Sequence, residues 1–136
     1  MKASELVASW TSHDNKRLTS KQVSIRLPVH IAARVFGLCD MFPNKTRTDI
    51  IADLLNSSLE ELEKNFGHHY SENDEIDVID GMAIYPDIGT YGKYANFVNK
   101  HYAELEKELG NENSSNLLST CISKPAKDRN DEEDDF

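Results

Sequence analysis

Cysteine is scarce in this sequence, and long apolar runs are missing from it altogether. Only two of the 136 residues are Cys, too few for a disulfide framework or a cysteine-based metal cluster. No stretch of about 18 consecutive apolar residues occurs, so we expect no transmembrane helix. The first ten residues hold the acidic Glu5 and lack the apolar core of a secretory signal. These absences predict a cytoplasmic protein that does not bind membranes.

The motifs that usually identify an enzyme are also missing. We find no Gly-rich phosphate loop, no nucleophile elbow and no Cys/His pair with an orienting residue. The adjacent His68 and His69 precede an acidic segment, but their spacing matches no known metal site. The sequence therefore predicts no enzyme, no cofactor and no metal site.

An overall excess of positive charge is absent too. The net charge is −9, which by itself argues against a nucleic-acid partner. The two halves differ, however: residues 1–64 hold nine Lys/Arg and eight Asp/Glu, whereas residues 65–136 hold six and sixteen. A weakly basic front half is thus joined to a strongly acidic back half, and the front half remains a candidate for binding an anionic partner.

Residues 21–28 predict a short β-strand. Apolar and polar side chains alternate along it, and a period of two places each set on its own face of the strand. The apolar members are Val23, Ile25 and Leu27, and the polar members are Gln22, Ser24 and Arg26. Pro28 closes the strand, because its ring suits the first turn of a following helix.

Two helices are expected after this strand. Apolar residues at three- and four-residue steps predict the first over about 29–41, and Pro43 stops it. The second begins near Thr46, where the sequence through Asp49 resembles a capping box with Asp in place of Glu. A wide Ile/Leu stripe continues this helix to about Lys64.

The flanking regions are predicted from local signals. Residues 1–20 are expected to form an arm with a short helix. In residues 75–110, the dipeptide Asp80-Gly81 between two apolar runs predicts a β-hairpin, and a helix follows. Residues 111–136 are rich in Ser and Asn and then in Asp and Glu, which predicts a disordered acidic tail. The expected fold class is mainly α with a short β-ribbon.

A single strand followed by two helices cannot be stable alone, because both strand edges are unpaired and so short a piece buries little surface. Two copies solve both problems if their strands pair antiparallel across a two-fold axis and cover a core of four helices. The order of elements in residues 21–64 resembles the ribbon-helix-helix superfamily of bacterial and phage repressors, the Arc and MetJ type. The sequence departs from that family in the turn, where Asn44 or Lys45 occupies the position of a common Gly.

The resemblance implies that residues 21–65 form a dimerisation and DNA-binding domain. It implies that the base edges of double-stranded DNA are read by Gln22, Ser24 and Arg26. It also implies that the start of the second helix binds a backbone phosphate through Lys45, Thr46, Arg47 and Thr48. The chemistry agrees, because Gln and Arg can bond adenine and guanine bidentately and helix N-termini bind anions.

The expected function is that of a homodimeric bacterial transcription regulator, and three alternatives stay open. The polar ribbon face also matches an ordinary solvated sheet face. An antitoxin would bind its operator in the same way and hold a toxin, a protein partner, with its back half. A dimeric interaction module would not touch nucleic acid. The acidic tail adds a hypothesis: it competes with DNA for the basic ribbon, so that deleting residues 125–136 strengthens binding at low salt.

Overall fold

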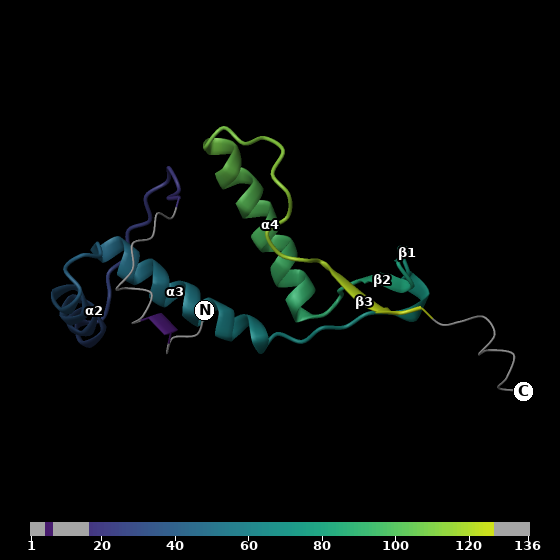
Figure 1. The fold of residues 1–136 in the computed structure, drawn as a ribbon, viewed down its shortest axis with the longest axis horizontal. Coiled ribbons are helices and arrows are strands. Elements are labelled where there is room, and N and C mark those ends of the chain that lie inside the picture. The colour runs from purple at the N-terminus through teal and green to yellow at the C-terminus, as the bar shows by residue number, and fades with distance from the viewer. Residues whose placement is uncertain (1–4, 7–16, 127–136) are drawn as a thin grey trace, which may run out of the picture. The chain divides into compact units, whose positions relative to one another are not determined.

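The chain consists of two compact units, seen in a computed structural model that describes residues 5–6 and 17–126 (Figure 1). The N-terminal unit is Met1–Asn65 and the C-terminal unit is Phe66–Phe136. The described residues form three long helices and one small antiparallel sheet. This mixed α/β content is broadly consistent with the mainly helical fold class that was expected. None of the described helices has the length and apolar character needed to cross a membrane.

The N-terminal unit contains the two helices that the sequence predicts, α2 (Val29–Met41) and α3 (Arg47–Lys64). Pro28 lies just outside α2 and its carbonyl oxygen accepts hydrogen bonds from the first turn. The capping box of α3 is confirmed: the Thr46 hydroxyl accepts from the Asp49 N–H, and the Asp49 carboxylate accepts from the Thr46 N–H. These bonds satisfy two N–H groups that helix geometry leaves without partners.

The core of this unit is small. Leu6 and Ile50 are fully buried, and four half-buried side chains surround them: Leu38, Cys39, Phe42 and Leu54. Leu6 comes from the N-terminal arm, residues 1–20, in which a short helix was expected, but residues 1–4 and 7–16 of that arm lie outside the described residues.

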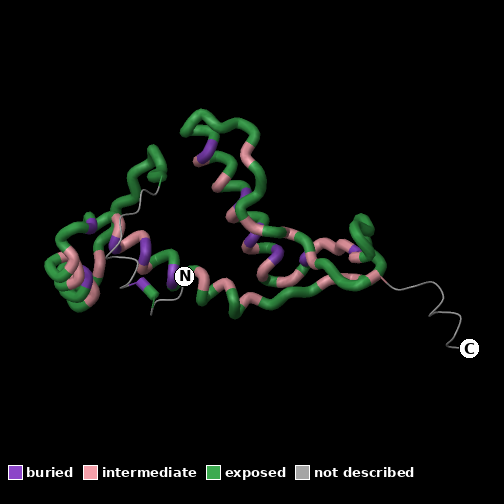
Figure 2. Tube along the Cα trace, in the orientation of Figure 1, coloured by how far each residue is buried: buried purple, intermediate pink, exposed green. Residues whose placement is uncertain are grey.

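One face of α3 carries leucine side chains that are exposed to solvent. Leu55, Leu59 and Leu62 follow one another at helical spacing and are each close to half exposed, while Asp53 and Ser57 are buried on another side of the helix. Figure 2 shows how little of the N-terminal unit is buried. The described part of the unit exposes nine large apolar side chains and buries three. A single copy therefore leaves much of its apolar surface uncovered.

The C-terminal unit begins with the predicted hairpin. Strands β1 (Asp77–Ile79) and β2 (Met82–Pro86) pair antiparallel, with Ile79 opposite Met82. The two residues between them, Asp80 and Gly81, have φ values of +52° and +80°. Positive φ at both positions is the geometry that an Asp-Gly turn provides, because it matches the twist of the flanking strands.

A third strand corrects one prediction. Residues 121–125 form β3 (Cys121–Pro125), which pairs antiparallel with β2, so the expectation of a disordered tail over 111–136 is wrong for this stretch. The segment is short, contains a proline and follows a Ser/Asn-rich stretch, so its strand character comes from its partner. Residues 127–136 lie outside the described residues.

Some of the backbone groups on the two outer edges of the sheet, which has the order β1-β2-β3, are bonded within the chain. On β1, the outward N–H of Val78 donates to the side chain of Asp77 over 2.8 Å. On β3, the Ser119 hydroxyl bonds both the N–H and the carbonyl of Cys121, and Pro125 has no N–H to offer. Such devices stop a sheet from pairing with another chain.

Helix α4 (Thr90–Glu108) completes the unit, and the sequence predicts it well. Asn99 on its inner side bonds both backbone groups of Leu118, with its amide donating over 3.0 Å and its oxygen accepting over 2.9 Å. The side chain thus imitates one rung of a β-ladder and ties the returning chain to the helix. At the end of α4, Gly110 has a φ of +93° and permits the two backbone bonds of a Schellman cap.

Candidate nucleic-acid interface

The ribbon segment, residues 22–27, differs from its prediction in the single chain. These residues have no regular secondary structure and are not part of the sheet of the C-terminal unit. Val23 and Ile25 are 77% and 67% exposed, and Leu27 is half-buried. A strand needs a neighbour to satisfy its backbone groups, and the described part of the chain supplies none to this segment.

The three side chains expected to read bases lie on this segment. Gln22, Ser24 and Arg26 are all exposed, as base-contacting residues must be in the absence of DNA. These three residues precede α2 in the sequence. The expected phosphate contacts lie after α2, at the start of α3.

The turn before α3 differs in part from expectation. Thr46, Arg47 and Thr48 are exposed at the start of the helix, but Lys45 is only 8% exposed. Its backbone N–H donates to the carbonyl of Phe42 and closes the turn. A side chain this well covered is poorly placed for a phosphate, so the burial of Lys45 speaks against its expected role.

Arg47 has a contact that the sequence did not predict. Its guanidinium carbon lies 4.4 Å from the centre of the Phe36 ring, a cation–π contact between the start of α3 and the middle of α2. Both side chains remain exposed. The contact holds Arg47 in a defined place next to the Thr46 cap and leaves its N–H groups able to bond a phosphate.

The charge around these residues is positive. Residues 17–47 contain six Lys/Arg and one Asp/Glu, which is a strong local bias in a chain whose net charge is −9. This stretch covers the ribbon segment, α2 and the turn. It is therefore the part of the molecule best suited to an anionic partner.

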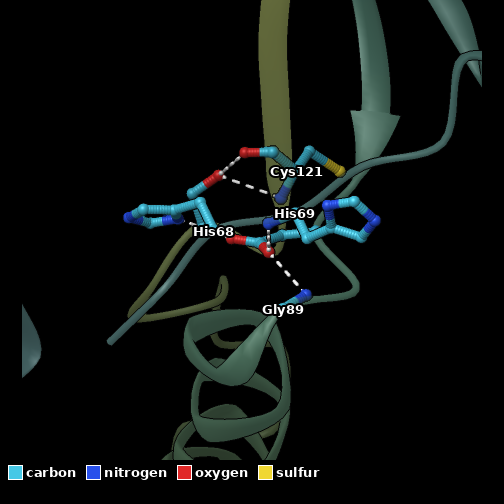
Figure 3. A network of polar contacts seen from close by, with 6 residues as sticks. His68, His69, Gly89 and Cys121 are labelled. Atoms are coloured by element: carbon cyan, nitrogen blue, oxygen red, sulfur yellow. Dashed lines mark hydrogen bonds and ion pairs between the residues drawn. The ribbon is translucent and has the colours of Figure 1, made fainter. Parts of the chain in front are cut away.

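A second polar centre lies in the C-terminal unit, around Asp87. Its carboxylate is buried and accepts from His68 Nδ1 at 2.7 Å, from the His69 backbone N–H at 3.2 Å and from the Gly89 N–H at 3.0 Å. These residues converge on the carboxylate just ahead of α4 (Figure 3). The His68 ring also packs at a tilt against Tyr91, with 4.6 Å between ring centres.

The charge of Asp87 is stabilised by its partners. Burial alone would raise the pKa of Asp87, but the hydrogen bonds from the His68 ring and from the His69 and Gly89 backbone outweigh burial, and the pKa lies below its ordinary value. The described residues contain no group of three or more potential ligands that could hold a metal ion. The centre acts as a clamp that joins two loops to the start of α4.

Sequence reasoning missed this clamp. The His68-His69 pair was noticed only as a weak metal candidate, and Asp87, which follows His68 by 19 residues, was not connected with it. The hairpin that brings them together lies between them, so only the folded unit reveals the contact.

Comparisons of the chain with protein-family models, with curated proteins and with solved structures found no match.

Proposed function

We propose that this chain is a homodimeric, sequence-specific DNA-binding protein of the ribbon-helix-helix type that regulates transcription in bacteria. The observation that carries the proposal is the state of the ribbon segment, which stands without a strand partner and with Val23 and Ile25 in water. Two capped helices with further exposed apolar side chains follow it directly. A second copy of the same segment would supply the missing strand and cover this surface.

In the proposed dimer, each chain contributes Gln22, Ser24 and Arg26 to the outer face of the two-stranded ribbon. A ribbon of this width fits the major groove, where Gln selects adenine, Arg selects guanine and Ser accepts either. The start of α3 fixes the position of the ribbon on the duplex through Arg47, Thr48 and the helix dipole. The positive charge of residues 17–47 supports this choice of partner.

The DNA part of the proposal is tested by selecting binding sites from a pool of randomised duplexes. Gln22→Ala and Arg26→Ala should each lose sequence preference, at roughly 1–3 kcal/mol per lost bidentate contact. Arg34→Ala is the matched control, because it removes the same charge from an exposed position on α2. Unchanged preference in both ribbon variants would overturn the proposal.

The dimer is tested separately with Ile25→Asn. In an isolated chain this residue is exposed, so the change would leave stability unaltered. In the proposed dimer it covers a shared core, and we expect the variant to dissociate and lose stability by about 2–4 kcal/mol. Sedimentation equilibrium measures whether the variant dissociates, and denaturant unfolding measures its loss of stability. A wild-type protein that is monomeric in solution would contradict the proposed ribbon dimer.

One observation favours the antitoxin as a second candidate. Ile76, Val78 and Ile79 are each at least half exposed, and they lie among five exposed carboxylates: Glu72, Asp74, Glu75, Asp77 and Asp80. An apolar surface with an acidic rim fits a basic protein partner. Stable co-purification with a small basic protein, lost when these three residues are replaced by Ser, would favour this candidate.

A further inference from the structure

Helix α4 carries an exposed face that the proposed ribbon mechanism does not use. Its members follow one another at helical spacing: Lys93, Asn96, Phe97, Lys100 and His101. We call this set the basic face of α4. Phe97 at its centre is 67% exposed, the most exposed aromatic side chain among the described residues. The opposite side of the helix is held inward by buried Ala95 and by the bonds of Asn99 to Leu118, so this face is fixed toward solvent.

The charge of this face contrasts with the rest of its unit. Residues 66–126 contain ten Asp/Glu and four Lys/Arg, but residues 90–103 contain no Asp/Glu and hold two of those lysines together with His101. The first carboxylate after this stretch is Glu104, which lies 3.7 Å from His101 and ends the basic face. Positive charge is thus gathered on one helix face of a mainly acidic unit, which indicates an anionic partner.

We infer that the basic face of α4 binds the sugar-phosphate backbone of duplex DNA, as a second contact beside the ribbon; this rests on the proposed function. Lys93 and Lys100 bind phosphates, the Asn96 amide donates to a phosphate oxygen, and the Phe97 ring lies against deoxyribose. Duplex DNA is the favoured occupant because the same chain carries the basic ribbon. Once the ribbon is bound, the covalent link at residues 65–66 gives α4 a high effective concentration of the same duplex.

The experiment measures how the affinity for a random-sequence duplex several helical turns long depends on salt. Each phosphate contact contributes close to one counterion to the slope of log K against log[salt]. In Lys93→Gln/Lys100→Gln we expect the slope to fall by about two per bound chain. Phe97→Ala should weaken binding several-fold and leave the slope unchanged, because it removes no charge. Gln is a good helix former, so circular dichroism should show α4 intact.

The matched control is Lys64→Gln/Lys124→Gln, which removes the same charge from exposed positions on α3 and β3, away from the basic face of α4. A fall in slope with the first pair and not with the control supports the inference. Equal falls in both pairs would show a general charge effect and overturn it. An unchanged slope in Lys93→Gln/Lys100→Gln would also overturn it, while the ribbon proposal stands if Arg26→Ala still loses sequence preference. If the wild type binds no duplex at any salt concentration, both fail and an acidic protein becomes the occupant to test.

Discussion

Asp87 is a buried carboxylate whose hydrogen bonds hold the C-terminal unit together just ahead of α4. Its side chain is almost completely buried, and it receives one ring N–H and two backbone N–H groups from two separate loops. A buried carboxylate is stable only when its oxygens are bonded in this way, and removing it leaves several donors without an acceptor. The Asp87 side chain, together with the backbone bonds of Ile88 to His69 and of Tyr91 to Gly67, therefore positions the start of α4.

We expect Asp87→Asn to lower the free energy of unfolding of this unit by about 2–3 kcal/mol, because bonds to a charged acceptor are stronger than those to an amide. Asp80→Asn makes the same chemical change at an exposed turn position that tolerates Asn, and it should have little effect. All five Tyr residues lie in the C-terminal unit, and the single Trp lies at position 10 in the N-terminal unit, so the tyrosine band in the near-ultraviolet circular dichroism of a Trp10→Phe background reports mainly the C-terminal unit during urea unfolding. Equal stability of the two variants would contradict the clamp.

The same carboxylate gives a pH dependence of known sign. The pKa of Asp87 is lower in the folded unit than its ordinary value, so the unfolded chain binds the proton more readily. The stabilisation is complete above the ordinary carboxyl pKa and is lost as the pH falls through the lower folded value. Unfolding at a series of pH values below about 4 should show a smaller loss in Asp87→Asn than in the wild type. Parallel curves for both proteins would contradict this.

At the scale of the elements, close packing decides where α4 begins. A Cβ atom on Gly92 would lie 1.7 Å from the carbonyl oxygen of Asp87, which is backbone and cannot move aside cheaply. Gly92→Ala should therefore destabilise the C-terminal unit, by roughly 1–3 kcal/mol or more. Gly37→Ala is the control, since a Cβ there meets nothing within 4 Å and Ala is favoured in a helix by about 1 kcal/mol. Opposite signs for the two changes are expected in urea unfolding, and a neutral Gly92→Ala would contradict the close approach.

The elements with local signals were predictable from the sequence. Helix α3 begins at a capping box readable from Thr46 and Asp49, and the hairpin turns at Asp80-Gly81, whose φ preferences are intrinsic. Strand β3 carries no such signal, because its five residues become a strand only by pairing with β2, more than thirty residues earlier. The ribbon segment shows the converse. Its apolar and polar residues alternate clearly, but the described part of a single chain provides no strand to pair with it.

Among the expected site residues, the exposure of some was predictable from the sequence and that of others was not. Gln22, Ser24 and Arg26 are exposed, as the alternating pattern indicates. The burial of Lys45 could not be foreseen, because a lysine in a polar turn gives no sign of what the folded unit packs around it. Whether these residues bind DNA stays a prediction.

At the scale of the whole molecule, the two ends of the chain differ in charge: residues 17–47 are mainly basic and the C-terminal residues are mainly acidic. Residues 127–136 carry six Asp/Glu and two Lys/Arg. If this segment competes with DNA for the positive ribbon, deleting it should strengthen binding at low salt, and the gain should vanish as salt screens the charges. The cut belongs after Ala126, because Pro125 pairs with Met82 and the Ala126 N–H bonds the Gly81 carbonyl.

This deletion is measured by DNA titration at low and high salt. A full-length variant with the six carboxylates changed to amides keeps the length of the tail and removes its charge. It should behave like the deletion, and unchanged affinity in both proteins would remove the competition model.

The bonded groups on the sheet edges restrict how copies of this protein can join. The Val78 N–H and both backbone groups of Cys121 are already bonded within their own chain, whereas residues 22–27 have no strand partner among the described residues. A pair related by a two-fold axis uses that stretch completely and leaves no further end to extend. In the proposed dimer, pairing of the two ribbon segments therefore gives no route to growth into filaments.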